Sequence, residues 1–375
     1  MSCADDRPLG PGSTIGILGT GQLGRMLALV ARRMGYRVAT YGDGPSPTPT
    51  GQVADVEVVA AWDDHARLGR FLDVVDVATV EFENVPPAAL DAARLARPSG
   101  NVLAACQRRD AEKRFLADHG LPTVRFAEVA GPGELAAFGF PAVAKTAAFG
   151  YDGKGQWLLR GPADVAAVPA GVPLVVEELV DLRAELSVIV ARGRHGERVC
   201  HPPIENHHRD HILDFSVAPA RLGDDVAAAA VAHAERIAEA LDLVGVLAVE
   251  FFLTADDRLV VNELAPRPHN SGHLTIEASP TSQFEQQLRA ITGMPLGPVA
   301  PFRPAAMANL MGDLWPAGGG EPDWEAALSR PGVSLHLYGK AEARPGRKMG
   351  HLTVVASTPD EALELVLDAR RSLQP

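Results

Sequence analysis

The sequence predicts two kinds of architecture in one chain, an open α/β sheet at the N-terminal end followed by a mixed α+β region. Near the N-terminus a buried strand, a glycine turn, a helix and a second strand follow one another, which is the order of a right-handed βαβ unit. Beyond residue 108 the strands come in pairs joined by short polar turns, which favours antiparallel pairing. With 375 residues the chain exceeds the roughly 250 to 300 residues at which a single core stops growing, so we expect two or three domains.

The first domain is expected over residues 1–105. "STIGILG" reads as a buried strand, "GTGQLGRM" opens a helix that ends near Gly35, and "YRVATYGDG" is the next strand. "VEVVAAW" and "VATVEFENV" continue the alternation, each followed by a helical segment. These elements predict an open α/β sheet.

The second domain is expected over residues 106–297 and begins with the helix "RRDAEKRFLADHG". "LPTVRFAEVA" and "FPAVAKTAAFGYDGKGQWLL" are predicted strands, and the second bends through its glycine-rich stretch as a hairpin or a flap. "PLVVEELV", "RAELSVIVAR", an alanine-rich helix over 225–241 and the run "GVLAVEFFLTADDRLVVNELAPR" follow. The third domain, residues 298–375, starts at a proline-rich linker and closes with the helix "PDEALELVLDARR".

Composition excludes several classes of protein. The formal charge of −12 gives no broad basic surface, so no nucleic-acid partner is expected. The three cysteines lie far apart and fit no zinc spacing, which favours a reducing cytoplasm. The opening residues have no apolar core and no run of about eighteen apolar residues follows, so we expect neither a signal peptide nor a membrane partner.

Two glutamates stand at matching places on either side of a predicted turn. In "AVEFFLTADDRLVVNEL" two apolar runs flank the polar "ADDR", which is the pattern of a β-hairpin. If the turn centres between Asp256 and Asp257, Glu250 lies directly opposite Glu263, with Cβ atoms about 4.5 to 5.5 Å apart. Two carboxylates on a poorly solvated face repel each other unless a cation lies between them. A hard divalent ion such as Mg²⁺, held partly by water and phosphate oxygens, resolves the conflict.

Two alternatives stay open for this pair. The glutamates could lie on the solvated side of an edge hairpin, where paired charges cost little, and a one-residue bulge would break the pairing. The polar run "APRPHNSGH" that follows favours the metal site. Its two prolines limit the directions in which the Arg267 guanidinium points, and a fixed guanidinium suits a planar oxyanion such as bicarbonate.

Several motifs, taken together in order and spacing, carry a resemblance to a known family. They are "GTGQLGRM", "VEFENV", "GYDGKGQ", "NELAPRPHNSGH", "HLYGK" and "RPGRKMGHLTV", and they span about residues 14 to 360. In these motifs the chain resembles the N5-carboxyaminoimidazole ribonucleotide synthetases, ATP-grasp enzymes of bacterial and fungal purine synthesis. The resemblance implies an N-terminal α/β (pre-ATP-grasp) domain, a central ATP-grasp domain and a small C-terminal domain, in agreement with the elements above.

The resemblance also implies a reaction. ATP phosphorylates bicarbonate, and the resulting carboxyphosphate delivers its carboxyl group, as CO₂, to the exocyclic amine of 5-aminoimidazole ribonucleotide. The products are the N5-carboxyamino compound, ADP and phosphate. Two Mg²⁺ ions are implied beside ATP, bridging the phosphates between Glu250 and Glu263, and a homodimer is the implied assembly.

The ATP site implied by the resemblance is spread over the central domain. Backbone groups of "EELV" would serve the adenine, and Glu185 would take the ribose hydroxyls. Glycines in the set permit backbone conformations that bring amides close to phosphates. The implied positions are Arg109, Lys145, Gly150, Tyr151, Asp152, Gly153, Lys154, Gly155, Gln156, Glu177, Glu178, Leu179, Val180, Glu185, His208, Asn262 and Glu263.

The resemblance also implies residues that bind the other two substrates. Asp152 would orient or deprotonate the amine, and Arg267 with His269 would hold bicarbonate and carboxyphosphate. Lys154 stands where many members of the family have arginine, so the charge is kept and bidentate contact is lost. The residues implied for the ribonucleotide, the last three through its phosphate, are Tyr151, Asp152, Lys154, Asn270, Lys340, Arg347 and Lys348.

Other functions compete with this one. "GTGQLG" followed by Asp43 fits the dinucleotide pattern, so a nicotinamide enzyme is an alternative, although that pattern alone is weak. The histidines of "NHHRDH" have no zinc-site companions, and we expect one ATP contact within a surface loop. A binding module without turnover is a third possibility. Within the ATP-grasp enzymes, the alternatives are formate-dependent glycinamide ribonucleotide transformylase and biotin carboxylase.

Overall fold

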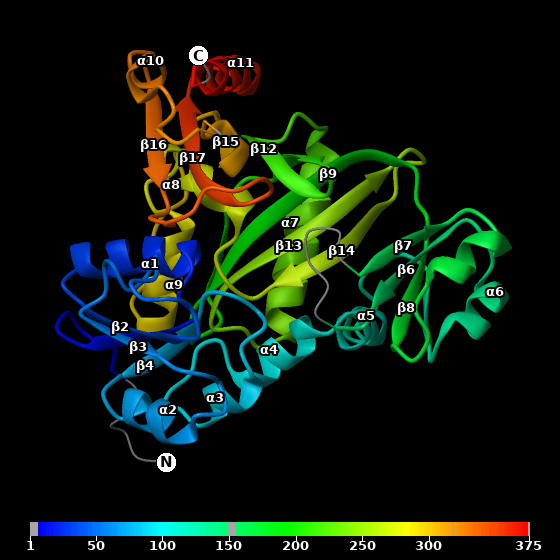
Figure 1. The fold of residues 1–375 in the computed structure, drawn as a ribbon, viewed down its shortest axis with the longest axis horizontal. Coiled ribbons are helices and arrows are strands. Elements are labelled where there is room, and N and C mark those ends of the chain that lie inside the picture. The colour runs from blue at the N-terminus through cyan, green and yellow to red at the C-terminus, as the bar shows by residue number, and fades with distance from the viewer. Residues whose placement is uncertain (1–6, 149–154, 317, 374–375) are drawn as a thin grey trace.

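The structure is a computed structural model, and it describes residues 7–148, 155–316 and 318–373. It contains a parallel sheet near the N-terminus, a long central sheet, and a small sheet to one side of the central one (Figure 1). The parallel and antiparallel parts follow each other in the predicted order, so the predicted α/β and α+β fold class is confirmed. Among the described residues, no helix is both long and apolar enough to span a bilayer.

The N-terminal sheet has the strand order β3-β2-β1-β4, and all its pairings are parallel. All five residues of the central strand β1 are buried, as expected for a parallel strand covered on both faces. The elements are β1 (Thr14–Leu18), α1 (Gln22–Arg33), β2 (Arg37–Gly42), β3 (Val56–Val59), α2 (His65–Leu72), β4 (Val77–Val80), α3 (Pro87–Asp91) and α4 (Gly100–Gln107).

The glycine turn between β1 and α1 is occupied by a side chain of the protein itself. The carboxylate of Glu81, just after β4, accepts hydrogen bonds from the backbone amides of Gly21 (2.6 Å) and Gly24 (3.0 Å). A Cβ atom at Gly21 would lie 2.6 Å from Glu81 Oε1, so the glycine is needed for this contact. Glu81 therefore stands where the dinucleotide pattern would place a ligand phosphate, at the positive end of the helix.

The small sheet has the antiparallel order β5-β8-β6-β7. The predicted hairpin pairing of β6 with β7 is confirmed, while its connecting residues 149–154 lie outside the described residues. Gly155 closes the base of that connection with a φ of +70°, and a Cβ there would lie 2.7 Å from Thr146 Oγ1. The elements here are α5 (Arg109–Asp118), β5 (Phe126–Val129), α6 (Leu135–Phe138), β6 (Ala142–Thr146), β7 (Gln156–Leu159) and β8 (Leu174–Glu178).

The central sheet has the order β14-β13-β9-β11-β12-β15-β17-β16, with the short β10 also paired to β9. The helix α7 packs on β9 and β13, and their apolar side chains form one core. The elements are β9 (Leu182–Arg192), β10 (Arg198–Cys200), β11 (Ile204–Arg209), β12 (Ile212–Ala218), α7 (Asp224–Ala240), β13 (Gly245–Thr254) and β14 (Leu259–Ala265).

The C-terminal segment extends the central sheet instead of forming a sheet of its own. Its strand β15 pairs with β12 of the central region, and β17 and β16 continue outward from it (Figure 1). The elements are β15 (Ala305–Met311), α10 (Trp324–Leu328), β16 (Val333–Leu337), β17 (Lys348–Val355) and α11 (Pro359–Arg371). The continuous sheet brings β17 toward the site described below, while the domain limits at residues 105 and 297 stay predictions.

Two elements differ from the sequence expectation. The helix α9 (Gln283–Thr292), preceded by α8 (Thr275–Ala278), was not predicted. Its Phe284, Leu288 and Ile291 pack into the core of the N-terminal sheet. The expectation that "NHHRDH" forms a surface loop is wrong, because β11 and β12 form a hairpin whose turn has positive φ at Asp210 and His211.

Candidate active site

The two predicted carboxylates face each other across the β13–β14 hairpin. Glu250 is the direct partner of Glu263, which confirms the predicted pairing, although the assumed turn was wrong. Near the turn the partners are Leu253 with Leu259 and Phe251 with Val261, so the hairpin closes one residue earlier than expected. A bulge next to Glu250 then shifts the register by one residue. The bulge, which was expected to break the pairing, creates it.

The bulge also explains why two adjacent residues face the same side. Side chains alternate between the faces of a regular strand, but Asn262 and Glu263 both line one cavity. The extra residue of a bulge re-aims the side chains beside it. Asn262 can therefore stand next to the carboxylate pair, as the predicted ATP site requires.

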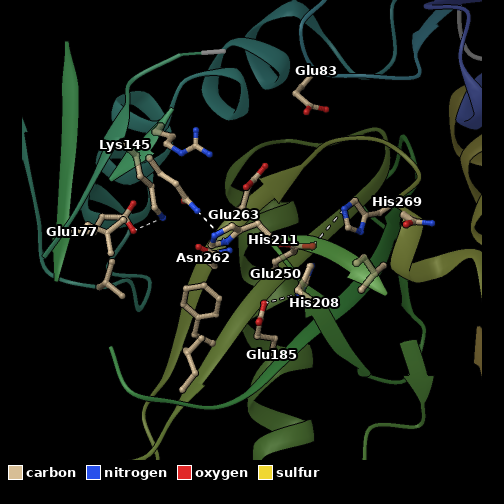
Figure 2. A pocket seen from close by; sticks show the side chains of 18 of the residues that line it. Glu83, Lys145, Glu177, Glu185, His208, His211, Glu250, Asn262, Glu263 and His269 are labelled. Atoms are coloured by element: carbon tan, nitrogen blue, oxygen red, sulfur yellow. Dashed lines mark hydrogen bonds and ion pairs between the residues drawn. The ribbon is translucent and has the colours of Figure 1, made fainter. Parts of the chain in front are cut away.

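A cavity of about 900 Å³ lies above this hairpin. Figure 2 shows Glu250 and Glu263 in its middle, with Lys145 and Glu177 on one side and His269 on the other. Its walls come from the N-terminal domain, the small sheet, the central sheet and β17. All three parts of the chain thus meet at the carboxylate pair.

Most of the predicted site residues line this cavity. Those that do are Arg109, Lys145, Gln156, Glu177, Glu178, Leu179, Val180, Glu185, His208, Glu250, Asn262, Glu263, Arg267, His269, Asn270 and Lys348. Among the described predicted residues, Gly155, Lys340 and Arg347 are outside its lining. Lys340 instead donates to the backbone carbonyl of Lys348 (2.6 Å), and Arg347 to that of Glu342 (2.8 Å). Outside the described residues are Gly150, Tyr151, Asp152, Gly153 and Lys154.

One wall carries a buried carboxylate held between two lysines. Lys145 Nζ lies 2.7 Å from Glu177 Oε2, and Lys113 Nζ lies 3.6 Å from Glu177 Oε1. Burial raises the pKa of Glu177, but the two lysines outweigh it and leave the pKa below its ordinary value. Glu177 is therefore an anion that fixes Lys145 at the cavity wall, where an ammonium can meet a phosphate oxygen.

No role for Glu83 was predicted from the sequence. This residue of the N-terminal domain forms an ion pair with Arg267 at the cavity. Nε and Nη2 of Arg267 both lie 2.5 Å from Oε2 of Glu83. Burial raises the pKa of the Glu83 carboxyl, yet Arg267 outweighs it and lowers the pKa overall. The signal was present, since an acidic residue that follows a buried parallel strand lies at the edge where α/β sheets bind ligands.

Two histidines, His208 and His269, line the cavity, and each lies close to a glutamate. His208 Nδ1 lies 2.9 Å from Glu185 Oε2; burial lowers the His208 pKa, but Glu185 outweighs it and raises the pKa overall. His269 Nε2 lies 3.5 Å from Glu250 Oε1, and burial holds the pKa of His269 well below its ordinary value. The Glu185–His208 pair offers both an acceptor and a donor, which suits adjacent hydroxyl groups.

An apolar wall completes the cavity and was also missed. Leu158, Leu179 and Leu182 are each about 40% exposed, although large aliphatic side chains are usually covered. They line the cavity together with Val143 and Phe252. A flat heteroaromatic ring inserted here would cover them, which gives the cavity an apolar end beside its charged centre.

The carboxylate pair fits a hard divalent cation. No group of three or more potential ligand side chains suited to a metal ion occurs among residues 7–148, 155–316 and 318–373. Magnesium, however, is commonly bound by one or two carboxylates together with phosphate oxygens and water. Burial, followed by the charge of Glu263, raises the pKa of Glu250 to about 7. A cation between the two would relieve this unfavourable arrangement.

The raised pKa of Glu250 predicts a pH-dependent stability in chelator-containing buffer. Between about pH 4.5 and 7 the folded state keeps a proton that the unfolded state has lost, so raising the pH favours unfolding. Thermal or denaturant unfolding at pH 5 and 7.5 is expected to show a loss on the order of 1 to 3 kcal/mol from this group. The Glu250→Gln variant should have a correspondingly flatter pH profile, and identical slopes in both proteins would contradict the assignment.

Three family models match successive parts of the chain. The ribonucleotide synthetase preATP-grasp domain matches residues 13–107 and the ATP-grasp domain matches residues 114–284. The phosphoribosylaminoimidazole carboxylase C-terminal domain matches residues 305–365. Together these matches cover each of the regions that contribute to the cavity.

Relatives of known sequence or structure agree with these models. The chain is 41% identical over 366 residues to N5-carboxyaminoimidazole ribonucleotide synthase of Bacillus subtilis, covering 94% of each chain. It is similar to the solved N5-carboxyaminoimidazole ribonucleotide synthetase of Thermus thermophilus, with 41% identity, a TM-score of 0.86 and coverage of 96% and 98%. It also resembles the synthase of Aspergillus clavatus solved with ADP and 5-aminoimidazole ribonucleotide, with 32% identity, a TM-score of 0.87 and coverage of 96% and 98%.

Proposed function

The chain belongs to the N5-carboxyaminoimidazole ribonucleotide synthases, and from this membership we propose that it carboxylates 5-aminoimidazole ribonucleotide at the expense of ATP. It is an ATP-grasp ligase of purine biosynthesis. The observation that carries the proposal is the facing pair Glu250 and Glu263 at the centre of a cavity lined by all three regions of the chain. The fungal relative was solved in complex with ADP and 5-aminoimidazole ribonucleotide, which supports binding of both an adenine nucleotide and this ribonucleotide.

ATP would lie along the cavity from its apolar to its charged end. The adenine fits the wall formed by Leu158, Leu179 and Leu182, beside the backbone that joins the small sheet to the central sheet. Glu185, paired with His208, would accept the ribose hydroxyls. Lys145 would meet the phosphates, as would Arg109, whose side chain lines the same wall.

Glu250 and Glu263 would hold Mg²⁺, with the neighbouring Asn262 as a further oxygen donor. When bound, the metal would neutralise charge on the phosphoryl group being transferred. The protein's own part in this step is to fix the geometry, because phosphoryl transfer depends chiefly on positioning and on neutralising charge. The Lys145–Glu177 pair and the β13–β14 bulge supply that rigidity.

Bicarbonate would bind between Arg267 and His269, close to the triphosphate end of ATP. Attack of a bicarbonate oxygen on the γ-phosphorus breaks its bond to ADP and forms carboxyphosphate. Loss of phosphate then leaves CO₂, which forms a carbon–nitrogen bond with the exocyclic amine while that amine gives up a proton. The guanidinium of Arg267, held by Glu83, would stabilise both anions.

The ribonucleotide would lie over this centre. Asp152, Tyr151 and Lys154 stay its predicted contacts from the glycine-rich stretch, and Asn270 and Lys348 line the cavity below. Lys340, which donates to the carbonyl of Lys348, and Arg347, which donates to that of Glu342, stay its predicted phosphate contacts. A homodimer in the cytoplasm stays our expectation for the assembly and its location.

Replacing Asp152 with asparagine removes the predicted proton acceptor while keeping the size of the side chain. We expect the rate of carboxylation to fall roughly 100-fold, with KM for ATP changed less than about twofold, because the amine loses its proton acceptor whereas the amide oxygen of asparagine can keep a polar contact with ATP. Steady-state phosphate release, measured at varied ribonucleotide and in a second series at varied ATP, gives both quantities. Asp118→Asn, at an exposed helix end, is the control. Wild-type turnover in Asp152→Asn would remove the proposed role.

Phosphate release tests the function itself. Release from ATP is expected only when bicarbonate and 5-aminoimidazole ribonucleotide are both present, and the product should carry label from ¹³C-bicarbonate. Formate with glycinamide ribonucleotide is the matched alternative pair and should give no turnover. Turnover with that pair, or phosphate release independent of the ribonucleotide, would contradict the proposal.

A further inference from the structure

A chain of buried polar side chains leads from the interior of the central sheet to His269. Ser216 Oγ donates to Asn206 Oδ1 (2.8 Å), and Asn206 Nδ2 donates to Ser187 Oγ (3.1 Å). Ser187 Oγ then donates to Ser271 Oγ (2.7 Å), which lies 2.9 Å from His269 Nδ1. The three serines are fully buried and Asn206 is 7% exposed. This polar chain is therefore shielded from competing water.

The groups next to His269 Nδ1 require this nitrogen to accept a hydrogen bond. The backbone amide of Ser271 lies 3.4 Å from Nδ1, and an amide N–H can only donate. The Ser271 hydroxyl oxygen already accepts from Ser187, so its own single hydrogen is free to point at Nδ1. The amide makes Nδ1 an acceptor and the hydroxyl hydrogen can donate to it as well, and a neutral imidazole whose Nδ1 accepts carries its proton on Nε2.

We propose that the polar chain Ser216–Asn206–Ser187–Ser271 fixes His269 as the neutral tautomer protonated at Nε2, so that His269 donates a hydrogen bond to the carboxyl-bearing anion and does not accept a proton. The identity of this anion rests on the proposed function, whereas the assignment of the tautomer rests only on the hydrogen bonds around His269. Ser271 and Ser187 are then positioning residues for the reaction.

The cavity side of His269 agrees with this assignment. Nε2 lies 3.5 Å from a carboxylate oxygen of Glu250, toward which the ring points in Figure 2. An N–H at that position meets the carboxylate favourably, whereas the other tautomer would turn a lone pair toward it and oppose both Ser271 donors. With Arg267 two residues away, the loop presents two donors to an oxyanion.

The assignment changes where a proton can go during the reaction. An Nε2 that already carries its hydrogen cannot take the proton released when the amine attacks CO₂. That proton must pass to another group, for which Asp152 is the predicted residue. His269 instead stabilises charge on the carboxyl oxygens by a hydrogen bond.

Nitrogen NMR on the resting protein tests the tautomer without any substrate. In protein labelled with ¹⁵N-histidine, the signals of His269 are identified by their loss in His269→Gln. Long-range couplings to the two ring C–H groups distinguish Nδ1 from Nε2, and we expect Nε2 protonated and Nδ1 not. Protonation at Nδ1 would overturn the proposal, whatever the substrate of the enzyme.

Removing the hydroxyl donor tests the role of the polar chain. In Ser271→Ala the Nδ1 signal is expected to shift, and KM for bicarbonate to rise about tenfold while KM for ATP stays within about twofold. Ser187→Ala removes the hydroxyl that donates to Ser271 and should shift the Nδ1 signal of His269 less. This variant replaces Ser271→Ala in the test if Ser271→Ala does not fold. Ser279→Ala removes a half-buried hydroxyl elsewhere and should change neither. An unchanged Nδ1 signal of His269 in both Ser271→Ala and Ser187→Ala would contradict the positioning role of these serines.

Discussion

Replacing Glu263 with glutamine is expected to lower kcat for ATP-dependent phosphate release by roughly three orders of magnitude while the protein stays folded. Glutamine keeps the shape of the side chain but loses the charge that would hold Mg²⁺ against the phosphates. The fold should tolerate the change, because without metal the two facing carboxylates oppose each other. Glu250→Gln should behave in the same way, since the pair acts as a unit.

The comparison separates a metal site from general damage. Phosphate release is measured with saturating bicarbonate and ribonucleotide, over a range of Mg²⁺ concentrations, alongside the unfolding midpoint. Glu128→Gln, at a half-exposed glutamate of β5 that pairs with Arg114, is the matched control and should keep full activity. A Glu263→Gln enzyme with wild-type turnover and wild-type Mg²⁺ dependence would remove these glutamates from the chemistry.

Replacing Arg267 with lysine is expected to lower kcat/KM for bicarbonate by roughly 100-fold or more, although the charge is conserved. In the wild type Nε and Nη2 of Arg267 meet Glu83 and Nη1 donates to the Pro268 carbonyl, which leaves one N–H on each of Nη1 and Nη2 for an anion. A lysine has one nitrogen for both tasks. It would either leave the buried Glu83 without a close partner or fail to reach the bicarbonate. Losing one member of a buried, hydrogen-bonded charge pair typically costs about 2 to 5 kcal/mol.

Initial rates at varied bicarbonate and fixed ATP measure this loss. KM for ATP should change little, because the residues proposed for the adenine, ribose and lysine contacts include neither Arg267 nor its partner Glu83. Arg183→Lys, at an exposed pair with Asp257, is the control for the substitution itself. A value of kcat/KM for bicarbonate within threefold of the wild type would show that the forked guanidinium is not needed.

The contact between Glu250 and Glu263 was predicted correctly from the sequence, although the turn assumed for that prediction was wrong. Apolar runs around "ADDR" identified the hairpin, and counting outward from an assumed turn brought Glu250 opposite Glu263. In the structure the turn is shorter and the bulge compensates. Neither the shorter turn nor the bulge leaves a clear signal in the sequence. The position of a bulge depends on contacts between the strand and segments that are distant in sequence. Here Lys113 donates to the carbonyl of Asn262, from a helix about 150 residues earlier.

Other misses have different physical causes. The helix α9 had a signal, since Ser282 accepts from the amide of Glu285 at its start and Gly293 ends it in the left-handed conformation. The strand β11 had none, because its buried Asn206 belongs to a network with Ser187 and Ser216 rather than to an apolar face. In β12, by contrast, Leu213, Phe215 and Val217 do alternate. Periodicity detects burial only where buried residues are apolar.

The resemblance, by contrast, brought together residues that no local pattern connects. Arg109, Glu185 and Arg267 come from three distant segments, and all line the one cavity. Glu83 was within a quoted motif but had no role until its contact with Arg267 was visible. Lys340 and Arg347 stay predictions, since the described structure keeps them outside the cavity lining.

The central claim is that the facing glutamates bind a divalent metal together with the phosphates of the nucleotide. The most direct measurement is a crystal structure with ADP and Mn²⁺, in which anomalous scattering locates the metal without assumptions about the ligand. We expect a peak within about 2.0 to 2.3 Å of oxygens from Glu250, Glu263 and the diphosphate. Diphosphate bound in the cavity with no metal peak at these carboxylates, or a peak held by other residues, would contradict it.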